Sequence, residues 1–149
     1  MLLKDVCTMD VACCGSATTA IEAARLMRHH HVGDLVVVDD PEEERIPLGV
    51  VTDRDLAIEV LGNALDPATT TVGALIGHPV VIATESEDTA EVIQRMRAQG
   101  VRRIPVVDGR GAAVGIVTLD DMLRHLTDEI GSLLDIVERG RRREQRARR

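Results

Sequence analysis

Aromatic residues are missing from this sequence, which contains no phenylalanine, tyrosine or tryptophan. Without aromatic rings the protein has no platform on which unpaired nucleic-acid bases could stack, so several nucleic-acid-binding designs are excluded. For the same reason, its core must consist of valine, isoleucine, leucine, methionine and alanine.

Long apolar runs are missing as well. No stretch approaches the roughly 18 apolar residues that cross a bilayer. Lys4 and Asp5 stand where a signal peptide would carry its apolar segment. We therefore expect a cytoplasmic protein with no membrane partner.

Cysteine is scarce: Cys7, Cys13 and Cys14 form an odd number with no C-x-x-C pair. This argues against a disulfide framework and a structural zinc site. The run His29–His31 does not change that view, because neighbouring helical residues point about 100° apart and cannot converge on one ion. We expect no metal site, and a redox switch through the cysteines is a further alternative.

The composition is that of an ordinary globular protein, with 149 residues, 44% hydrophobic and 29% charged. Its charge is unevenly placed. Residues 139–149 contain seven of the 18 basic residues and one glutamate, whereas the remainder is strongly acidic. This basic tail has no apolar face, so we expect it to be mobile or to order on an acidic surface. By itself it does not identify nucleic acid as a partner.

The chain repeats itself. When each residue is aligned with the one 69 positions later, identical or similar residues recur, and the shift becomes 66 after a loop that is three residues longer in the first copy. The matching pairs include Glu22 with Glu91, Met27 with Met96, Val37 with Val106 and Asp39 with Asp108. The chain is therefore two copies of one unit.

Each copy has the pattern of a β-α-β-β-α unit, which predicts an α/β (α+β) fold. Thr19-x-x-Glu22 and Asp88-x-x-Glu91 resemble the capping boxes that open helices, and short β-branched runs predict buried strands. The predicted strands are 11–14, 35–38 and 49–52 in the first copy and 80–83, 104–107 and 115–118 in the second. A second helix follows the last strand of each copy.

These patterns divide the chain into four segments. We expect a first repeat over 1–61, a linker over 62–71, a second repeat over 72–130, and a helical extension with the basic tail over 131–149. Apolar spacing continues past Gly131 for about two turns, and Gly140 is expected to end the helix there.

The pattern Gly-x-x-Thr-x-x-Asp occurs at Gly49–Asp55 and again at Gly115–Asp121, and Val101–Asp108 reads VRRIPVVD. In this order and spacing, the doubled unit resembles a tandem pair of CBS (cystathionine β-synthase) domains. The resemblance implies two repeats related by a pseudo-twofold axis, with packed sheets. It also implies clefts for adenosine-containing ligands, pairing into a homodimer, and sensing rather than catalysis.

The motif residues suit such a ligand chemically. An ionised aspartate one turn into a helix can accept hydrogen bonds from ribose hydroxyls, and arginines suit phosphate geometrically. The resemblance points to one cleft with Thr118, Asp121, Arg102, Arg103, Ile104 and Pro105, and to a second with Thr52, Asp55 and Arg54. Thr-x-x-Asp is also the pattern of a plain helix cap, so that interpretation stays open.

The two clefts are not expected to be equivalent. In the first repeat, Gly33-Asp34-Leu35-Val36 replaces Arg-Arg-Ile-Pro, and an aspartate there would repel phosphate. We expect a stand-alone regulatory module, not an enzyme, that needs no obligatory cofactor. It would bind AMP, ADP or ATP, or else S-adenosylmethionine, and signal to an unknown protein partner. The alternative is a ligand-free dimeric interaction module that acts through its C-terminal helix and Arg-rich tail.

Overall fold

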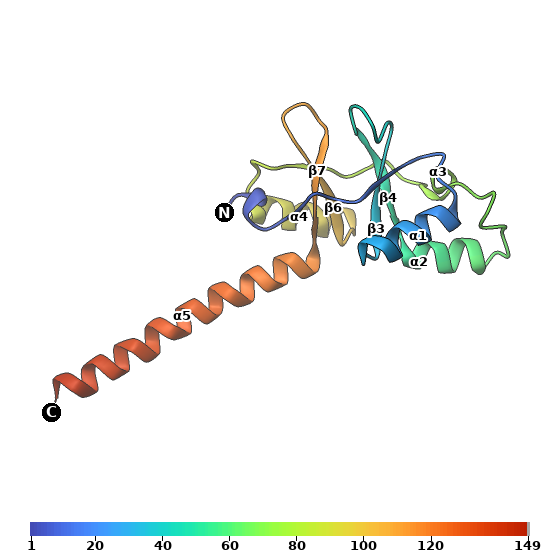
Figure 1. Ribbon diagram of the computed structural model, residues 1–149. Helices are drawn as coiled ribbons and strands as arrows, with labels where there is room; N and C mark the ends of the chain where they lie inside the picture. The colour runs from blue at the N-terminus through green and yellow to red at the C-terminus, as the bar shows by residue number, and fades with distance from the viewer. Residues whose placement is uncertain (149) are drawn as a thin grey trace.

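The computed structural model describes residues 1–148 and contains two small β-sheets with helices around them. Figure 1 shows the two halves side by side, with the hairpins β3–β4 and β6–β7 next to each other at the centre. The predicted fold of two β-α-β-β-α repeats is confirmed.

The first half contains a three-stranded sheet of order β2-β3-β4. Its strands are β2 (Cys13–Gly15), β3 (Asp34–Val38) and β4 (Pro47–Thr52), and its first helix is α1 (Ala20–His30). The Thr19–Glu22 capping box that opens α1 is present. After β4, the short α2 (Asp53–Asp55) continues as a π-helical segment, η2 (Leu56–Leu61).

The second half contains a four-stranded sheet of order β1-β7-β6-β5. Its strands are β1 (Thr8–Met9), β5 (Ala83–Thr84), β6 (Arg103–Val107) and β7 (Ala113–Thr118), with helix α4 (Thr89–Gln99). Asp88 caps α4 by accepting a hydrogen bond from the Ala90 amide, but the expected reciprocal contact of Glu91 is not formed.

The first strand of each repeat is shorter than expected. The predicted strand 11–14 is reduced to β2, and 80–83 is reduced to β5. Two arginine side chains bond to the backbone just before these strands: Arg45 donates to the Val11 oxygen at 3.3 Å, and Arg95 donates to the Ile82 oxygen at 2.8 Å.

The halves exchange their leading segments. Leu3, in the short 3₁₀ helix η1 (Leu3–Asp5), is fully buried in the core of the second half with Val92 and Ile104. In the same way Val72, in the short helix α3 (Val72–Leu75), is fully buried in the core of the first half. The segment that begins each copy in the sequence therefore completes the other copy in space.

A shared core joins the two sheets. Val36 and Val38 of β3 pack with Ala113 and Ile116 of β7, and Val11 fills the same cluster. All five are small or β-branched. This packing brings the carboxyl ends of β4 and the start of β6 close together, where the candidate site lies.

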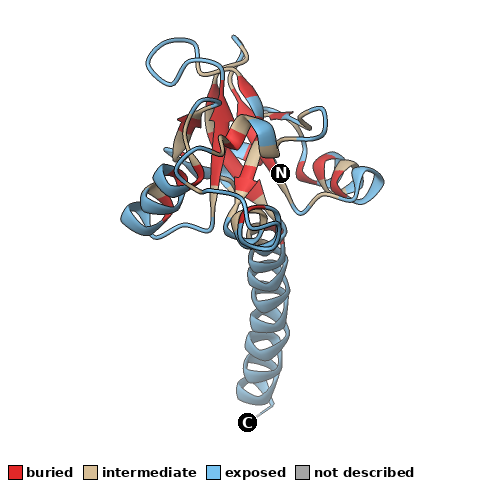
Figure 2. Cartoon of the chain, turned by 90° about the vertical axis from the view of Figure 1, so that its right-hand side faces the viewer, coloured by how far each residue is buried: buried red, intermediate tan, exposed pale blue. Residues whose placement is uncertain are grey.

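The longest element is helix α5 (Leu119–Ala147), which extends away from the body (Figures 1 and 2). The expected end at Gly140 is wrong, since neither Gly131 nor Gly140 interrupts the helix. A helical glycine costs only about 1 kcal/mol, and the residues around Gly140 are mostly strong helix formers. An i,i+4 pair of Glu138 and Arg142 also spans it.

The Arg-rich segment, expected to be mobile or to order on an acidic surface, forms the last turns of α5, where the positive charge of its arginines interacts favourably with the helix dipole. Arg149, the last residue of the predicted tail, lies outside the described residues. Within residues 1–148, no helix combines the length and the apolar content of a transmembrane span.

Candidate functional site

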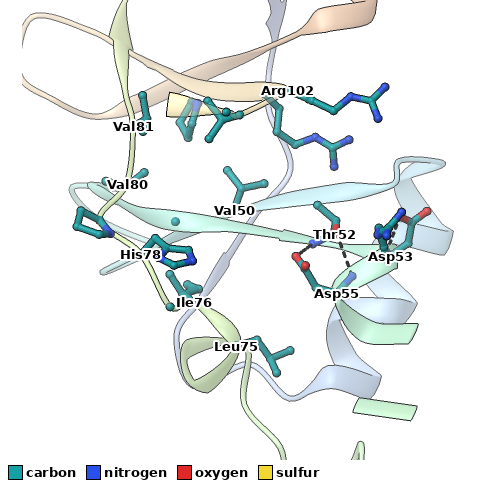
Figure 3. Close-up of a pocket in the computed structure, with 18 residues that line it drawn as sticks. Val50, Thr52, Asp53, Asp55, Leu75, Ile76, His78, Val80, Val81 and Arg102 are labelled. Atoms are coloured by element: carbon teal, nitrogen blue, oxygen red, sulfur yellow. Dashed lines mark hydrogen bonds between the residues drawn. The ribbon is translucent and has the colours of Figure 1, made fainter. Parts of the chain in front are cut away.

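A pocket of about 500 Å³ lies between the two repeats (Figure 3). Three segments line it: the end of β4 with the start of α2, the chain over residues 75–81, and the approach to β6 over residues 100–105. Each repeat therefore contributes one wall. The chain over residues 75–81, which we call the crossing segment, closes the side between them.

The Thr52–Asp55 motif forms one wall of this pocket. Thr52 Oγ1 accepts a hydrogen bond from the Asp55 amide at 3.0 Å, and Asp55 Oδ2 accepts one from the Thr52 amide at 2.9 Å. The motif is therefore a capping box. The second oxygen, Oδ1, accepts no hydrogen bond within residues 1–148, so Asp55 can cap the helix and still accept from a ligand.

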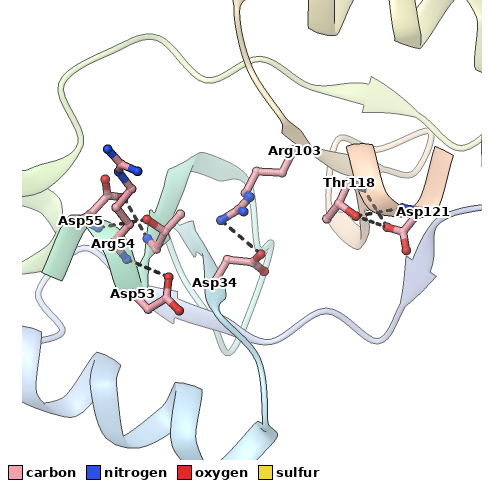
Figure 4. A network of polar contacts seen from close by, with 8 residues as sticks. Asp34, Asp53, Arg54, Asp55, Arg103, Thr118 and Asp121 are labelled. Carbon is pink, nitrogen blue, oxygen red and sulfur yellow. Dashed lines mark hydrogen bonds and ion pairs between the residues drawn. The ribbon is translucent and has the colours of Figure 1, made fainter. Parts of the chain in front are cut away.

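The opposite wall carries the arginines. Arg102 and Arg103 line the pocket with Pro105, and Arg54 lies on the Asp55 side. Arg103 forms an ion pair with Asp34 at 3.5 Å (Figure 4). Among the described residues, Arg54 and Arg102 have no carboxylate within 4.0 Å. Two positive charges are thus available to an anionic ligand.

The structure corrects how the arginines and the motifs were combined. Arg102 and Arg103 were expected beside Thr118 and Asp121, but they share the pocket with the other motif, Thr52 and Asp55. Arg102 directly precedes β6 and Arg103 begins it, and β6 contacts β4 of the other repeat. Ile104, also predicted here, is fully buried in the core of the second half.

Thr118 and Asp121 do not line this pocket. They cap α5 with the same reciprocal pair of hydrogen bonds, and Thr118 Oγ1 also donates to Asp121 Oδ2 at 2.8 Å. The surroundings are acidic, since Asp121 and Asp53 both raise the pKa of Asp34, after burial as the main cause. Asp34 therefore lies near carboxylates of both motifs, and the inequivalence of the two clefts stays a prediction.

The crossing segment was not predicted as part of the site. Ile76, His78, Val80 and Val81 line the pocket, although this stretch was assigned to a strand and the loop before it. Gly49 lets the segment pass close to β4, because a Cβ there would lie 2.5 Å from Ile76 Cγ2. No local sequence signal marks this contact, since its partners are 27 residues apart.

The cysteines are placed unfavourably for a redox switch. Cys14 is buried, and burial raises the pKa of its thiol to about 11. Burial also raises the pKa of Cys7. Because the thiolate is the reactive form, these two thiols react slowly at neutral pH. Cys13 is half-buried and accepts a hydrogen bond from Arg45 at 3.1 Å.

Replacing Asp34 with asparagine should stabilise the protein at neutral pH. Burial is the main reason that the pKa of Asp34 lies above its ordinary value of 3.8, and the nearby Arg103 only partly opposes this. An acid with a raised folded pKa binds more protons in the folded state, so its destabilising effect is absent below about pH 4 and grows as the pH rises through the folded pKa.

We therefore expect Asp34→Asn to have a higher Tm than the unmodified chain at pH 7, and the two Tm values to converge near pH 3. Thermal unfolding followed by circular dichroism at both pH values measures this. Asp128→Asn, on the exposed face of α5, is the control and should change little at either pH. A lower Tm for Asp34→Asn at pH 7 would contradict the prediction.

Comparison with known proteins gives a consistent picture. The family model of the CBS domain matches the chain twice, over residues 3–62 and 72–128. Hypoxic response protein 1 of Mycobacterium tuberculosis is 35% identical over 125 residues, covering 84% of this chain and 85% of that protein. The uncharacterized protein MK0525 of Methanopyrus kandleri is 34% identical over 120 residues, covering 80% of this chain and only 60% of that relative.

Solved structures agree with these matches. Hypoxic Response Protein I with two coordinated zinc ions matches with a TM-score of 0.72 at 34% identity, covering 84% of this chain and 98% of that one. The CBS domain pair of protein MJ0100, in complex with 5′-methylthioadenosine and S-adenosyl-L-methionine, has a TM-score of 0.74 at 27% identity, covering 87% and 98%. Within residues 1–148 of this chain, no three His, Cys, Asp or Glu residues cluster as metal ligands.

Fold and cleft together define a module built from a doubled β-α-β-β-α unit with a pocket between the copies. The chain belongs to the CBS domain family and carries both units of a tandem CBS pair.

Proposed function

We propose that this protein is a regulatory module that binds an adenosine-containing ligand in the pocket between its repeats. One observation carries the proposal: the same pocket combines the acceptor Asp55 with the cations Arg54 and Arg102. AMP, ADP or ATP fits this combination best, and S-adenosylmethionine is the next candidate. The adenosyl ligands in the MJ0100 complex support the same class.

The pocket offers a separate surface for each part of such a ligand. Half-buried apolar side chains of Ile76, Val80 and Val81 suit the adenine base. Asp55 Oδ1 suits the ribose hydroxyls, and the guanidinium groups suit phosphate. A ligand held in this way contacts both repeats and the crossing segment, so it can stabilise one arrangement of the module over another.

Regulation requires a protein that responds to the module. We propose that this module acts on a protein partner in the cytoplasm. It would do so as a homodimer and without catalysis. Signalling then requires that the partner prefer the arrangement that the ligand stabilises. An alternative function is a ligand-free interaction module acting through α5. The exposed apolar residues of that helix favour this alternative.

A dye-based thermal shift against AMP, ADP, ATP and S-adenosylmethionine tests the proposal, since the chain lacks tryptophan and tyrosine for intrinsic fluorescence. A ligand at about 100 times its Kd adds about 2.7 kcal/mol, which raises the Tm by roughly 5–10 °C for a chain of this size. We expect this shift for one nucleotide at least.

Two matched variants identify the working motif. Asp55→Ala and Asp121→Ala remove the same kind of capping box, so each should cost about 1 kcal/mol of stability. Only Asp55→Ala should abolish the ligand-induced shift. A shift lost in Asp121→Ala alone would move the site to the other motif, and no shift with any of the four ligands would favour the interaction module.

A further inference from the structure

Helix α5 exposes an apolar stripe that the rest of the chain does not cover. Of its 29 residues only Met122 is buried. The stripe consists of Leu119, Leu123, Leu126, Ile130, Leu133 and Val137, whose exposed fractions lie between 37% and 63%. Figure 2 shows the helix extending from the body with its whole distal part exposed. An apolar stripe of this length on a soluble protein marks an interaction surface.

The spacing of the stripe is that of a coiled coil. Successive members are separated alternately by four and three residues, which is the heptad repeat of helices that pack along their length. An antiparallel partner with the same stripe would leave no member unpaired. In that register, Leu119 faces Val137, Leu123 faces Leu133, and Leu126 faces Ile130, each pair occurring twice.

Charge along the helix selects the antiparallel orientation. Residues 119–138 contain six acidic residues and one arginine, and residues 139–148 contain six arginines and one glutamate. Parallel helices would place like charges together over both segments. In the antiparallel register the acidic segments of the two copies still overlap, but the arginines of each copy lie beyond Leu119 of the other α5, next to a body (residues 1–118) with 18 acidic and 10 basic residues. The antiparallel orientation thus avoids contact between the two arginine segments and brings each of them to an acidic surface.

We infer that α5 pairs in antiparallel orientation with α5 of a second copy of this chain. The inference rests on the proposed homodimer and specifies how its two copies meet. The contact is isologous, so it closes at two copies. The Arg-rich end then serves to bind the acidic body of the partner, and the two pockets lie at opposite ends of the helix pair.

Light scattering after gel filtration, with concentration from the refractive index, tests the surface. We expect the unmodified chain at twice 16.2 kDa and the double variant Ile130→Asp with Leu133→Asp at 16.2 kDa. Ser132→Asp adds one negative charge between them but off the stripe, and it should stay dimeric. A double variant that remains dimeric would overturn the pairing through α5 while leaving a homodimer in place. A monomeric unmodified chain would overturn both.

Disulfide trapping tests the orientation. Leu123→Cys combined with Leu133→Cys should cross-link two copies under mild oxidation, because these positions face each other only in the antiparallel register. Within one helix they are about 15 Å apart, too far for an internal bridge. Leu123→Cys alone should cross-link no more than the unmodified chain with its three cysteines. Efficient cross-linking of the single variant would show parallel helices and overturn the inference.

Ligand binding is measured separately on the monomeric double variant. Neither Ile130 nor Leu133 lines the pocket, so the nucleotide-induced thermal shift should persist in it. Failure of the helix pairing is thereby distinguished from failure of the proposed function.

Discussion

Reversing the charge at Arg102 should strongly weaken nucleotide binding. Arg102→Glu removes a cation that has no carboxylate within 4.0 Å among residues 1–148, and it adds a negative charge to the wall that would meet phosphate. A hydrogen bond to a charged group contributes about 1.5–3 kcal/mol. Loss of that bond together with the new repulsion should weaken the affinity by about 100-fold or more.

Isothermal titration calorimetry of the unmodified chain and the variant measures this loss. Arg97→Glu makes the same change on the exposed end of α4, outside the pocket, and should bind the nucleotide with nearly unchanged affinity. Unchanged affinity in Arg102→Glu would show that the phosphates do not contact this wall.

The same variant discriminates between ligand classes. S-adenosylmethionine carries no phosphate and has a positive sulfonium, so Arg102→Glu should not weaken its binding. A parallel loss for ATP and S-adenosylmethionine would indicate that Arg102 supports the shape of the pocket and does not contact phosphate directly.

Truncating Ile104 should cause the largest loss of stability. Its side chain is fully buried and packs in one cluster with Leu3, Val92, Val117 and Met122. Removing a buried isoleucine to alanine leaves a cavity and costs about 2–5 kcal/mol. For a chain of this length the Tm should fall by roughly 5–20 °C.

Thermal and urea unfolding, followed by far-ultraviolet circular dichroism, measure this effect. Ile58→Ala is the matched control, because Ile58 is 47% exposed on η2 and its truncation opens no cavity. A fall in Tm no greater than that of the control would show that the core of the second half does not depend on this side chain. It would also contradict the burial of Leu3, which belongs to the same cluster.

Local patterns predicted most of the secondary structure. The four central strands are β-branched runs bounded by turn residues, and both Thr-x-x-Asp motifs form capping boxes, because a cap depends on side chains within one turn. The end of α5 was predicted wrongly for a related reason. A glycine is only a weak local signal, and the helix formers around Gly140 outweigh it.

The site was harder to predict because its parts come from different repeats. Arg102 is near Thr118 in the sequence of the second copy, yet it lines the pocket with Thr52. Sequence order gives no information about which copy supplies the opposite wall. The crossing segment with His78 and Val80 was missed for the same reason, as its role depends on passing over β4.

By itself, the sequence determined the doubled unit, the central strands and the capped helices. These depend on repetition, periodicity and neighbouring residues. The tertiary structure alone decided that Leu3 and Val72 complete the opposite cores and that the arginines join Asp55. Such choices depend on how two copies of one unit exchange segments and pack, and contacts between distant residues leave no local trace in the chain.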